Sequence, residues 1–233
     1  MQIACETDET CTLDRRATAS ATVTAAPIRK GDDPIEHHSE RHSENQPDDR
    51  TDDDRTGDDG GGRPDGEPIR LLFVCLGNIC RSPTAEAVMG HLVERAGLAE
   101  RIEVDSAGTS GWHVGDPPDE RATAEAGRRG VAMRSSARAF HPGDYERYDL
   151  ILAMDRTNLA DLHDVAPDGH LRERAVLLRS FDPAVPDGHA AEVPDPYYGG
   201  PDGFADVYDL IHAACTGLLD HLVDTHALEQ PHA

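Results

Sequence analysis

One stretch of eight residues, Cys75 to Ser82, combines side chains whose types and spacing could support chemistry. It reads Cys-Leu-Gly-Asn-Ile-Cys-Arg-Ser, with five residues between the first cysteine and the arginine. Glycine and asparagine tolerate unusual backbone dihedral angles, so successive backbone N–H groups can turn inward around an anion. Arg81 can place its planar guanidinium across two oxygens of that anion. The stretch therefore predicts a cradle for a phosphate group.

Cys75 would lie at the bottom of this electropositive cup. Groups that hold a dianion also stabilise a thiolate, and the hydroxyl of Ser82 can donate to the same sulfur. A thiolate beneath a bound phosphate is aligned for in-line attack on phosphorus, which gives a phosphocysteine intermediate. A buried structural cysteine or a surface arginine would be the ordinary interpretation of either residue alone. Their joint occurrence after a strand favours the reactive interpretation.

The elements on either side explain how the cradle is positioned. Residues 69–74 are apolar at all but one position, as in a buried strand. After the loop, Ser82 and Pro83 predict a helix N-cap followed by proline at the first helical position. Apolar residues then recur with helical spacing until Gly97. The cradle thus joins a strand to a helix N-terminus, whose N–H groups and dipole also favour an anion.

Strands and helices alternate along the rest of this region. Further strands are expected at 102–106, 150–154 and 175–178, and helices at 119–129, 156–165 and along an apolar face from 204 to 222. This alternation predicts a single α/β domain with a four-stranded parallel sheet, helices on both faces and the phosphate-binding loop after the first strand. Ligands of such sheets bind beyond the carboxyl ends of the strands, where this loop begins.

Composition separates the first 67 residues from the rest. They contain no Phe, Tyr or Trp and end in an acidic, glycine-rich stretch. Because so little apolar surface cannot offset chain entropy, we expect a disordered acidic tail at 1–67, an ordered domain at 68–228 and a frayed end at 229–233. His37, His38 and His42 could bind a metal ion, but a solvated cluster is the favoured interpretation in such a tail. We expect no metal ion or other cofactor.

The net charge of −23 disfavours nucleic acid as a partner, because counterion release needs a surplus of Lys and Arg. No apolar run approaches the roughly 20 residues that span a bilayer, and the first residues do not resemble a signal peptide. Five cysteines are too few, and odd in number, for a disulfide-built secreted domain. We therefore expect a cytoplasmic protein without a membrane partner. A monomer is the default, with weak self-association as an alternative.

The segment from Phe73 to Pro83, Phe-Val-Cys-Leu-Gly-Asn-Ile-Cys-Arg-Ser-Pro, resembles the signature of the low-molecular-weight protein tyrosine phosphatases. The similarity extends from about Ile69 to Leu222 and does not include the tail. The other matching segments are 105–109, 111–112, 117–119, 154–159 and 195–199. The resemblance implies that phosphotyrosine-containing proteins are the substrates.

The resemblance also implies roles for single residues. Cys75 matches the nucleophile, Arg81 the phosphate-binding arginine and Asp195 the general acid. A proton donor suits a leaving phenoxide, whose pKa is about 10, and the same carboxylate could then activate water against the thiophosphate. The remaining positions of the cradle match residues that bind phosphate or support the loop: Leu76, Gly77, Asn78, Ile79, Cys80, Ser82 and Ser106.

Three aromatic residues, Trp112, Tyr197 and Tyr198, match the walls around the substrate ring. A flat apolar slot suits a phenyl ring, and its depth would disfavour the shorter phosphoserine. Cys80 matches a second cysteine that could form a reversible disulfide with Cys75 and protect it from over-oxidation.

Other activities are compatible with the same cradle. An arsenate reductase would need further cysteines, and Cys215, the only one after the loop, falls on the apolar face of the last predicted helix. A protein arginine phosphatase tends to carry threonine where this chain has Ile79. A non-catalytic phosphate-binding module would lack the nucleophile or the acid, whereas both are present. The sequence therefore favours hydrolysis of phosphotyrosine through a phosphocysteine.

Overall fold

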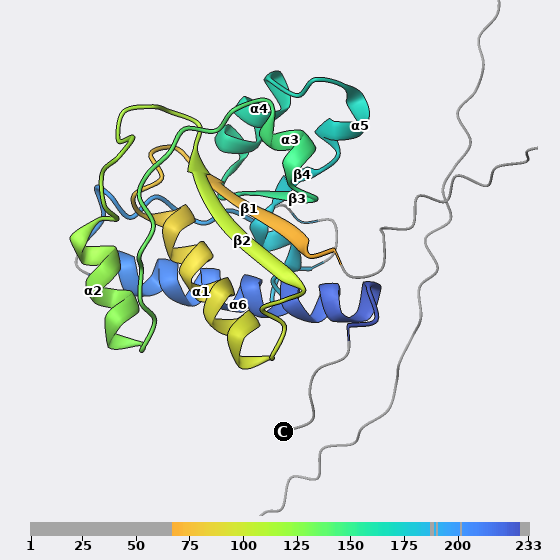
Figure 1. Ribbon diagram of the computed structural model, residues 1–233. Coiled ribbons are helices and arrows are strands. Elements are labelled where there is room, and N and C mark those ends of the chain that lie inside the picture. The colour runs from red at the N-terminus through yellow and green to blue at the C-terminus, as the bar shows by residue number, and fades with distance from the viewer. Residues whose placement is uncertain (1–66, 187–188, 190, 201, 229–233) are drawn as a thin grey trace, which may run out of the picture. The chain divides into compact units, whose positions relative to one another are not determined.

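The computed structural model of the protein describes residues 67–186, 189, 191–200 and 202–228 (Figure 1). The predicted disordered tail lies outside the described residues except for its last residue, Glu67. The predicted frayed end, 229–233, and the histidines at 37–42 also lie outside them.

Four strands form one parallel sheet, as the sequence predicts, and their order in it is β2-β1-β3-β4. They are β1 (Ile69–Cys75), β2 (Ile102–Gly108), β3 (Leu150–Ala153) and β4 (Ala175–Leu177). The central residues of β1 are fully buried, because helices cover both faces of the sheet. Cys75 ends β1 opposite Gly108, the last residue of β2. The first cysteine of the motif therefore stands at the carboxyl edge of the sheet.

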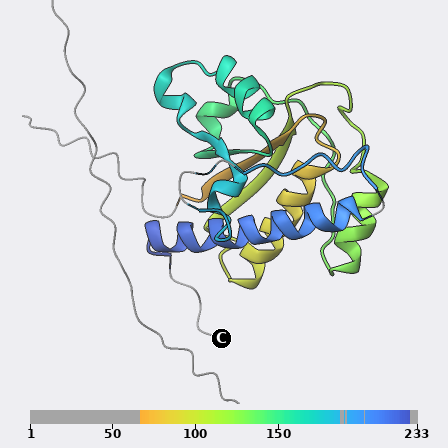
Figure 2. The same cartoon turned by 180° about the vertical axis from the view of Figure 1, so that it is seen from behind.

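The helices form two layers. On one face, α1 (Arg81–Arg95), α2 (Glu120–Arg128) and α6 (Gly203–Thr225) bury the apolar core that includes Leu71 and Phe73 of β1. On the other face, α3 (Asp144–Arg147), α4 (Arg156–Asp164) and α5 (Gly169–Arg172) pack on Leu72 and Val74. Figures 1 and 2 show α1 crossing α6 obliquely, and the two helices pack against each other. The side chains of β1 alternate between the two cores, as the pleat requires.

The predicted long helices are present with small shifts of their ends. The apolar face predicted for α6 is buried throughout, Cys215 included. The four-residue elements α3, α5 and η1 (Leu178–Phe181) were not predicted, because one turn carries no helical periodicity. Of the helices in the described part of the chain, none has the length and apolar composition of a membrane span.

The predicted start of α1 was wrong. The helix begins at Arg81 with Cys80 at the N-cap position, whereas the sequence predicts Ser82 as the cap. The Ser82 hydroxyl lies 3.0 Å from Cys75 Sγ and 3.2 Å from the carbonyl oxygen of Ala107 instead. Pro83 is still tolerated, because the first four N–H groups of a helix have no intrahelical acceptor. The serine is thus used for the site and not for capping.

Candidate active site

Carbonyl groups of the phosphate loop, residues 75–82, accept hydrogen bonds from the segment that follows β2. The carbonyl oxygen of Cys75 accepts from the N–H of Thr109 over 2.9 Å, and that of Leu76 accepts from the N–H of Ser110 over 2.9 Å. Gly108 allows this close approach, since a Cβ there would lie 2.8 Å from the Leu76 carbonyl oxygen. With its carbonyls bonded outward, the loop can turn amide groups toward its centre, as an anion requires.

Asn78 holds the turn in the middle of the loop. It is buried and has a φ of 55°, in the left-handed region that is uncommon for residues with a Cβ. Its Nδ2 donates to Ser82 Oγ (3.0 Å) and Ser106 Oγ (2.8 Å), and its Oδ1 accepts from the backbone N–H of Arg138 (2.8 Å). These bonds determine the orientation of the amide and stabilise the strained turn.

The sulfur of Cys75 receives hydrogen-bond donors from its own loop. The backbone N–H of Asn78 donates to Cys75 Sγ over 3.3 Å, and Ser82 Oγ lies 3.0 Å away. Since Asn78 donates to Ser82 Oγ, the single hydroxyl proton of Ser82 is available to the sulfur or to the Ala107 carbonyl. This arrangement suits a thiolate, because both neighbours can donate to it.

Arg81 is positioned by the ends of two other segments. Its Nη1 contacts Asp155 Oδ2 (2.5 Å) and donates to the carbonyl oxygen of Val193 (3.2 Å), while its Nη2 contacts Asp195 Oδ2 (3.0 Å). The side chain is only 4% exposed. Burial alone would lower the pKa of Arg81, but Cys75 and the two carboxylates raise it, so the guanidinium stays charged.

Asp155 was not assigned a role from the sequence. It follows β3 and caps α4, since its Oδ1 accepts from the N–H of Asn158 over 2.7 Å. The same carboxylate orients Arg81. The sequence feature that could have identified Asp155 is its position directly after a buried parallel strand, because ligands of such sheets bind at the carboxyl ends of the strands.

Asp195 belongs to the acid loop, residues 192–200. This segment is joined to the end of β3, because the N–H of Val193 donates to the carbonyl oxygen of Met154 over 2.8 Å. Asp195 Oδ1 accepts from the N–H of Tyr197 over 3.0 Å, and its side chain remains about half exposed. The fold thus brings Asp195 to Arg81 across a large sequence separation.

The residues of both loops enclose one pocket of about 170 Å³. It is lined by Cys75 and other residues of the phosphate loop, by the acid loop and by the segment at 112–113. Trp112 is 80% exposed and Tyr198 95% exposed, whereas Tyr197 is 40% exposed. His113 also lines the pocket and was not predicted to do so. The lining residues are Cys75, Leu76, Gly77, Ile79, Cys80, Arg81, Trp112, His113, Asp195, Tyr197 and Tyr198.

Arg121 connects the two sides of the pocket and was also missed. Its guanidinium binds both oxygens of Asp119 and donates to the carbonyl oxygen of Tyr197 over 3.3 Å. It also lies 5.4 Å from the Tyr197 ring centroid and 4.6 Å from that of Phe204. The N–H of Asp119 in turn donates to the carbonyl oxygen of Ile79 in the phosphate loop over 2.7 Å. Arg121 therefore ties the acid loop to the phosphate loop.

The second cysteine of the loop, Cys80, lies in surroundings that favour its neutral thiol. Burial, with the nearby charges of Asp119, Cys75 and Asp195, raises the pKa of Cys80 to about 12. Cys75, Cys80 and Cys215 are free thiols. Among the described residues, no three His, Cys, Asp or Glu side chains gather to hold a metal ion.

The amino-acid sequence is similar to those of known proteins. The sequence model of the family described as low molecular weight phosphotyrosine protein phosphatase matches residues 70–228. A low molecular weight protein-tyrosine-phosphatase from Streptomyces coelicolor is 48% identical over 150 residues (64% of this chain, 91% of that protein). One from Schizosaccharomyces pombe is 46% identical over 141 residues (60% and 88%).

A solved structure agrees with this match. The protein tyrosine phosphatase from Entamoeba histolytica, crystallised with Hepes in its active site, superposes with a TM-score of 0.63 at 38% identity (69% of this chain, 99% of that one). Since the family match covers more than half of the chain, the chain belongs to the low molecular weight phosphotyrosine protein phosphatase family.

Proposed function

We propose that this chain hydrolyses phosphotyrosine in proteins through a phosphocysteine on Cys75. The observation that carries the proposal is one pocket that Cys75, Arg81 and Asp195 line together, with Asp195 Oδ2 3.0 Å from Arg81 Nη2. A nucleophile, an arginine that can bind two phosphate oxygens and a proton donor thus face the same bound phosphate group.

In the first step, the Cys75 thiolate attacks phosphorus and the bond to the phenolic oxygen breaks. Arg81 and the loop amides bind the equatorial oxygens, whose charge they stabilise in the transition state. Asp195, in its protonated form, donates a proton to the departing phenolate.

In the second step, Asp195 acts as a general base. Its carboxylate takes a proton from water as the water oxygen attacks phosphorus, and the sulfur–phosphorus bond breaks. The products are inorganic phosphate and the Cys75 thiolate. The hydroxyl of Ser82, 3.0 Å from the sulfur, stabilises the thiolate as it leaves. Every step uses side chains of this chain.

The pocket walls support an aromatic substrate. Trp112, Tyr197 and Tyr198 border the entrance, where they can stack against a phenyl ring above the phosphate. Ile79, and not a threonine, lines the pocket, which supports phosphotyrosine over phosphoarginine. Cys215 is fully buried against α1, which argues against a disulfide relay of the arsenate reductase kind.

The domain boundaries and location form part of the proposal. We place the catalytic domain at 68–228, acting as a monomer. A nucleophilic thiol must stay reduced, which supports a cytoplasmic location. Deletion of residues 1–67 should leave turnover of p-nitrophenyl phosphate unchanged, and a large loss would contradict this boundary.

The substrate class is tested with matched peptides that carry phosphotyrosine, phosphoserine or phosphoarginine at one position. We expect release of inorganic phosphate to be fastest from the phosphotyrosine peptide. Cys75→Ser should lower the rate of phosphate release by about 10⁴-fold or more. Cys215→Ala is the control for the loss of a thiol elsewhere in the chain. Preference for phosphoarginine, or turnover by Cys75→Ser, would contradict the proposal.

A further inference from the structure

Arg138 lies outside the pocket but contacts the phosphate loop through its main chain. Its backbone N–H donates to Asn78 Oδ1 over 2.8 Å, and its carbonyl oxygen accepts from the N–H of Gly108 over 2.8 Å. The first bond holds the side chain that stabilises the left-handed turn, and the second holds the strand end that pairs with Cys75. The main chain at residue 138 therefore supports the loop at two points.

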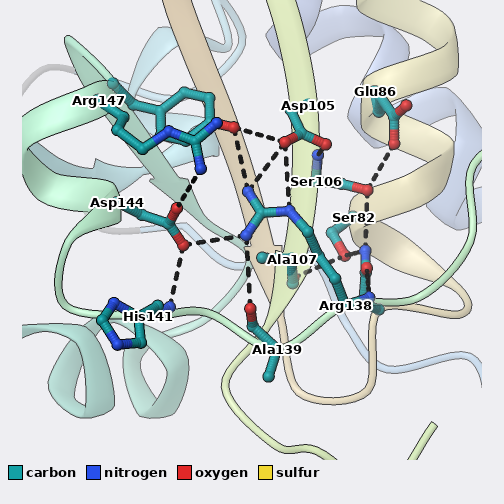
Figure 3. A network of polar contacts seen from close by, with 12 residues as sticks. Ser82, Glu86, Asp105, Ser106, Ala107, Arg138, Ala139, His141, Asp144 and Arg147 are labelled. Atoms are coloured by element: carbon teal, nitrogen blue, oxygen red, sulfur yellow. Dashed lines mark hydrogen bonds and ion pairs between the residues drawn. The ribbon is translucent and has the colours of Figure 1, made fainter. Parts of the chain in front are cut away.

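The Arg138 side chain adds to the contacts that hold this main chain. Residues 131–142 connect α2 to α3 outside any helix or strand, and main-chain hydrogen bonds to Gly108 and Asp116 hold residues 137–140 in part. Arg138 Nη2 donates to Asp105 Oδ2 over 2.9 Å, and Nη1 donates to Asp144 Oδ2 over 3.0 Å (Figure 3). Asp105 is in β2 and Asp144 in α3. One cation thus anchors the segment to two elements.

Both carboxylates are themselves held in place. The hydroxyl of Tyr148 donates to Asp105 Oδ2 over 2.5 Å, and the N–H of His141 donates to Asp144 Oδ2 over 2.9 Å. Burial raises the pKa of Tyr148 to about 12, so the hydroxyl keeps its proton. Burial alone would raise the pKa of Asp105, but Tyr148 and Arg138 lower it. Arg138 therefore meets two carboxylates that other groups hold in place.

Strand β2 connects this network to the loop a second time. Asp105 is followed by Ser106, whose Oγ accepts from Asn78 Nδ2 over 2.8 Å and donates to Glu86 Oε2 over 2.5 Å. Figure 3 shows Ser106 and Glu86 beside the Arg138 contacts. A displacement of Arg138 would therefore affect the hydrogen bonds at both Oδ1 and Nδ2 of the Asn78 side chain.

We propose that the Arg138 side chain is a positioning residue for the phosphate loop: it anchors residues 137–140 between β2 and α3 and so keeps Asn78, Ser82 and the loop amides aligned with the transferring phosphate. This inference rests on the proposed function, because it concerns the same loop. Misalignment weakens contacts that are strongest in the transition state, so it lowers kcat more than it raises KM.

The test compares Arg138→Met with Arg129→Met. Arg129 also joins two carboxylates, Glu125 at 2.9 Å and Asp209 at 2.5 Å, but it connects α2 to α6 away from the phosphate loop. Both full-length variants are assayed with p-nitrophenyl phosphate below their melting temperatures. Inorganic phosphate binding is also measured by calorimetry for each change in a Cys75→Ser background, where no turnover is needed.

We expect Arg138→Met to lose about tenfold in kcat and several-fold in phosphate affinity, and Arg129→Met to retain both. Arg138→Lys should fall between wild type and Arg138→Met, because an ammonium cannot bridge two carboxylates in the same geometry. Equal kcat and phosphate affinity in the two Met variants would overturn the inference. If Arg138→Met does not fold, an Arg138→Lys variant that matches Arg129→Met would overturn it instead. If the wild type shows no turnover but the affinity for phosphate still depends on Arg138, the proposed function is contradicted and this inference is not.

Discussion

The phosphate loop and the acid loop face each other across one pocket but are held by different means. Cys75, Asn78 and Arg81 of the phosphate loop are each at most 3% exposed as whole residues, and the loop is bonded to β2, to Asp155 at the start of α4 and to the segment at 138. The acid loop is open to solvent, with Asp195 about half exposed and Tyr198 95% exposed. Its anchors are Val193, Arg81 and Arg121.

This difference matches what each loop must do. Stabilising the charge of a transferring phosphoryl group needs donors that are already oriented, and burial strengthens them. A proton carrier must exchange protons and admit both a substrate ring and a water molecule, which requires access. The comparison predicts that damage to the phosphate loop slows every substrate, whereas damage to the acid loop depends on the leaving group.

The largest effect in this comparison should come from Arg81→Lys. The ammonium keeps the charge but cannot contact two phosphate oxygens and Asp155 as the planar fork does. We expect kcat to fall about 10²- to 10³-fold for phenyl phosphate and p-nitrophenyl phosphate alike. Steady-state kinetics with both esters measures it, and Arg134→Lys, an exposed arginine outside the pocket, is the control. A loss confined to one ester would contradict the assigned role.

Asp195→Asn should show the opposite pattern. An amide cannot protonate the leaving oxygen, so phenyl phosphate should slow about 10²-fold or more. With p-nitrophenyl phosphate, whose leaving group needs less protonation, phosphorylation of the enzyme should slow much less. Single-turnover rates separate this step from hydrolysis of the intermediate. Equal losses for both esters would remove the distinction between the loops.

Arg121→Ala should have a smaller effect, because Arg121 is exposed and lies outside the pocket, where it supports the acid loop from Asp119. We expect a two- to fivefold decrease in kcat, about the effect of losing an exposed ion pair, larger for phenyl phosphate than for p-nitrophenyl phosphate. Glu120→Ala, at the neighbouring exposed position, is the control. An equal effect of both variants would show that Arg121 does not support Asp195.

The smallest expected signal is the reactivity of Cys80. With a pKa of about 12, Cys80 stays a neutral thiol at pH 7–9 and its labelling rises only as the pH approaches that value. Iodoacetamide at pH 8 should therefore modify Cys75, with protection by inorganic phosphate, and spare Cys80. Peptide mass spectrometry reads both sites. Labelling of Cys80 at pH 8 would show that burial does not control this thiol.

The same peptides test the disulfide hypothesis. Peroxide would convert Cys75 to a sulfenic acid, which Cys80 would attack with release of water. Irreversible sulfonic acid on Cys75, with Cys80 reduced, would contradict it.

The sequence was sufficient for the phosphate loop because its parts are contiguous. A strand, a loop with Cys-x5-Arg-Ser and a helix lie within residues 69–95, so local patterns gave the sheet position and the anion cradle. Asp195 was proposed as the general acid only through the family resemblance, since the turn around it has no local pattern that indicates an acid. The cap predicted at Ser82 was wrong, because a local rule cannot detect a sulfur that recruits the hydroxyl.

The residues that were missed act over long sequence separations. Asp155 meets Arg81 from 74 residues away, and Arg121 meets the Tyr197 carbonyl from 76 residues away. Arg138 contacts Asp105 from 33 residues away. Each is an ordinary charged residue in its local sequence, so only the packed chain distinguishes it from a solvated surface residue.

The most direct test of the central claim is to trap the intermediate. In Asp195→Asn, transfer from p-nitrophenyl phosphate to the enzyme should proceed, while hydrolysis of the thiophosphate lacks its base. Acid quenching followed by peptide mass spectrometry should find phosphate on the peptide that contains Cys75. Phosphate on another residue, or p-nitrophenol release without any phosphoenzyme, would contradict the account.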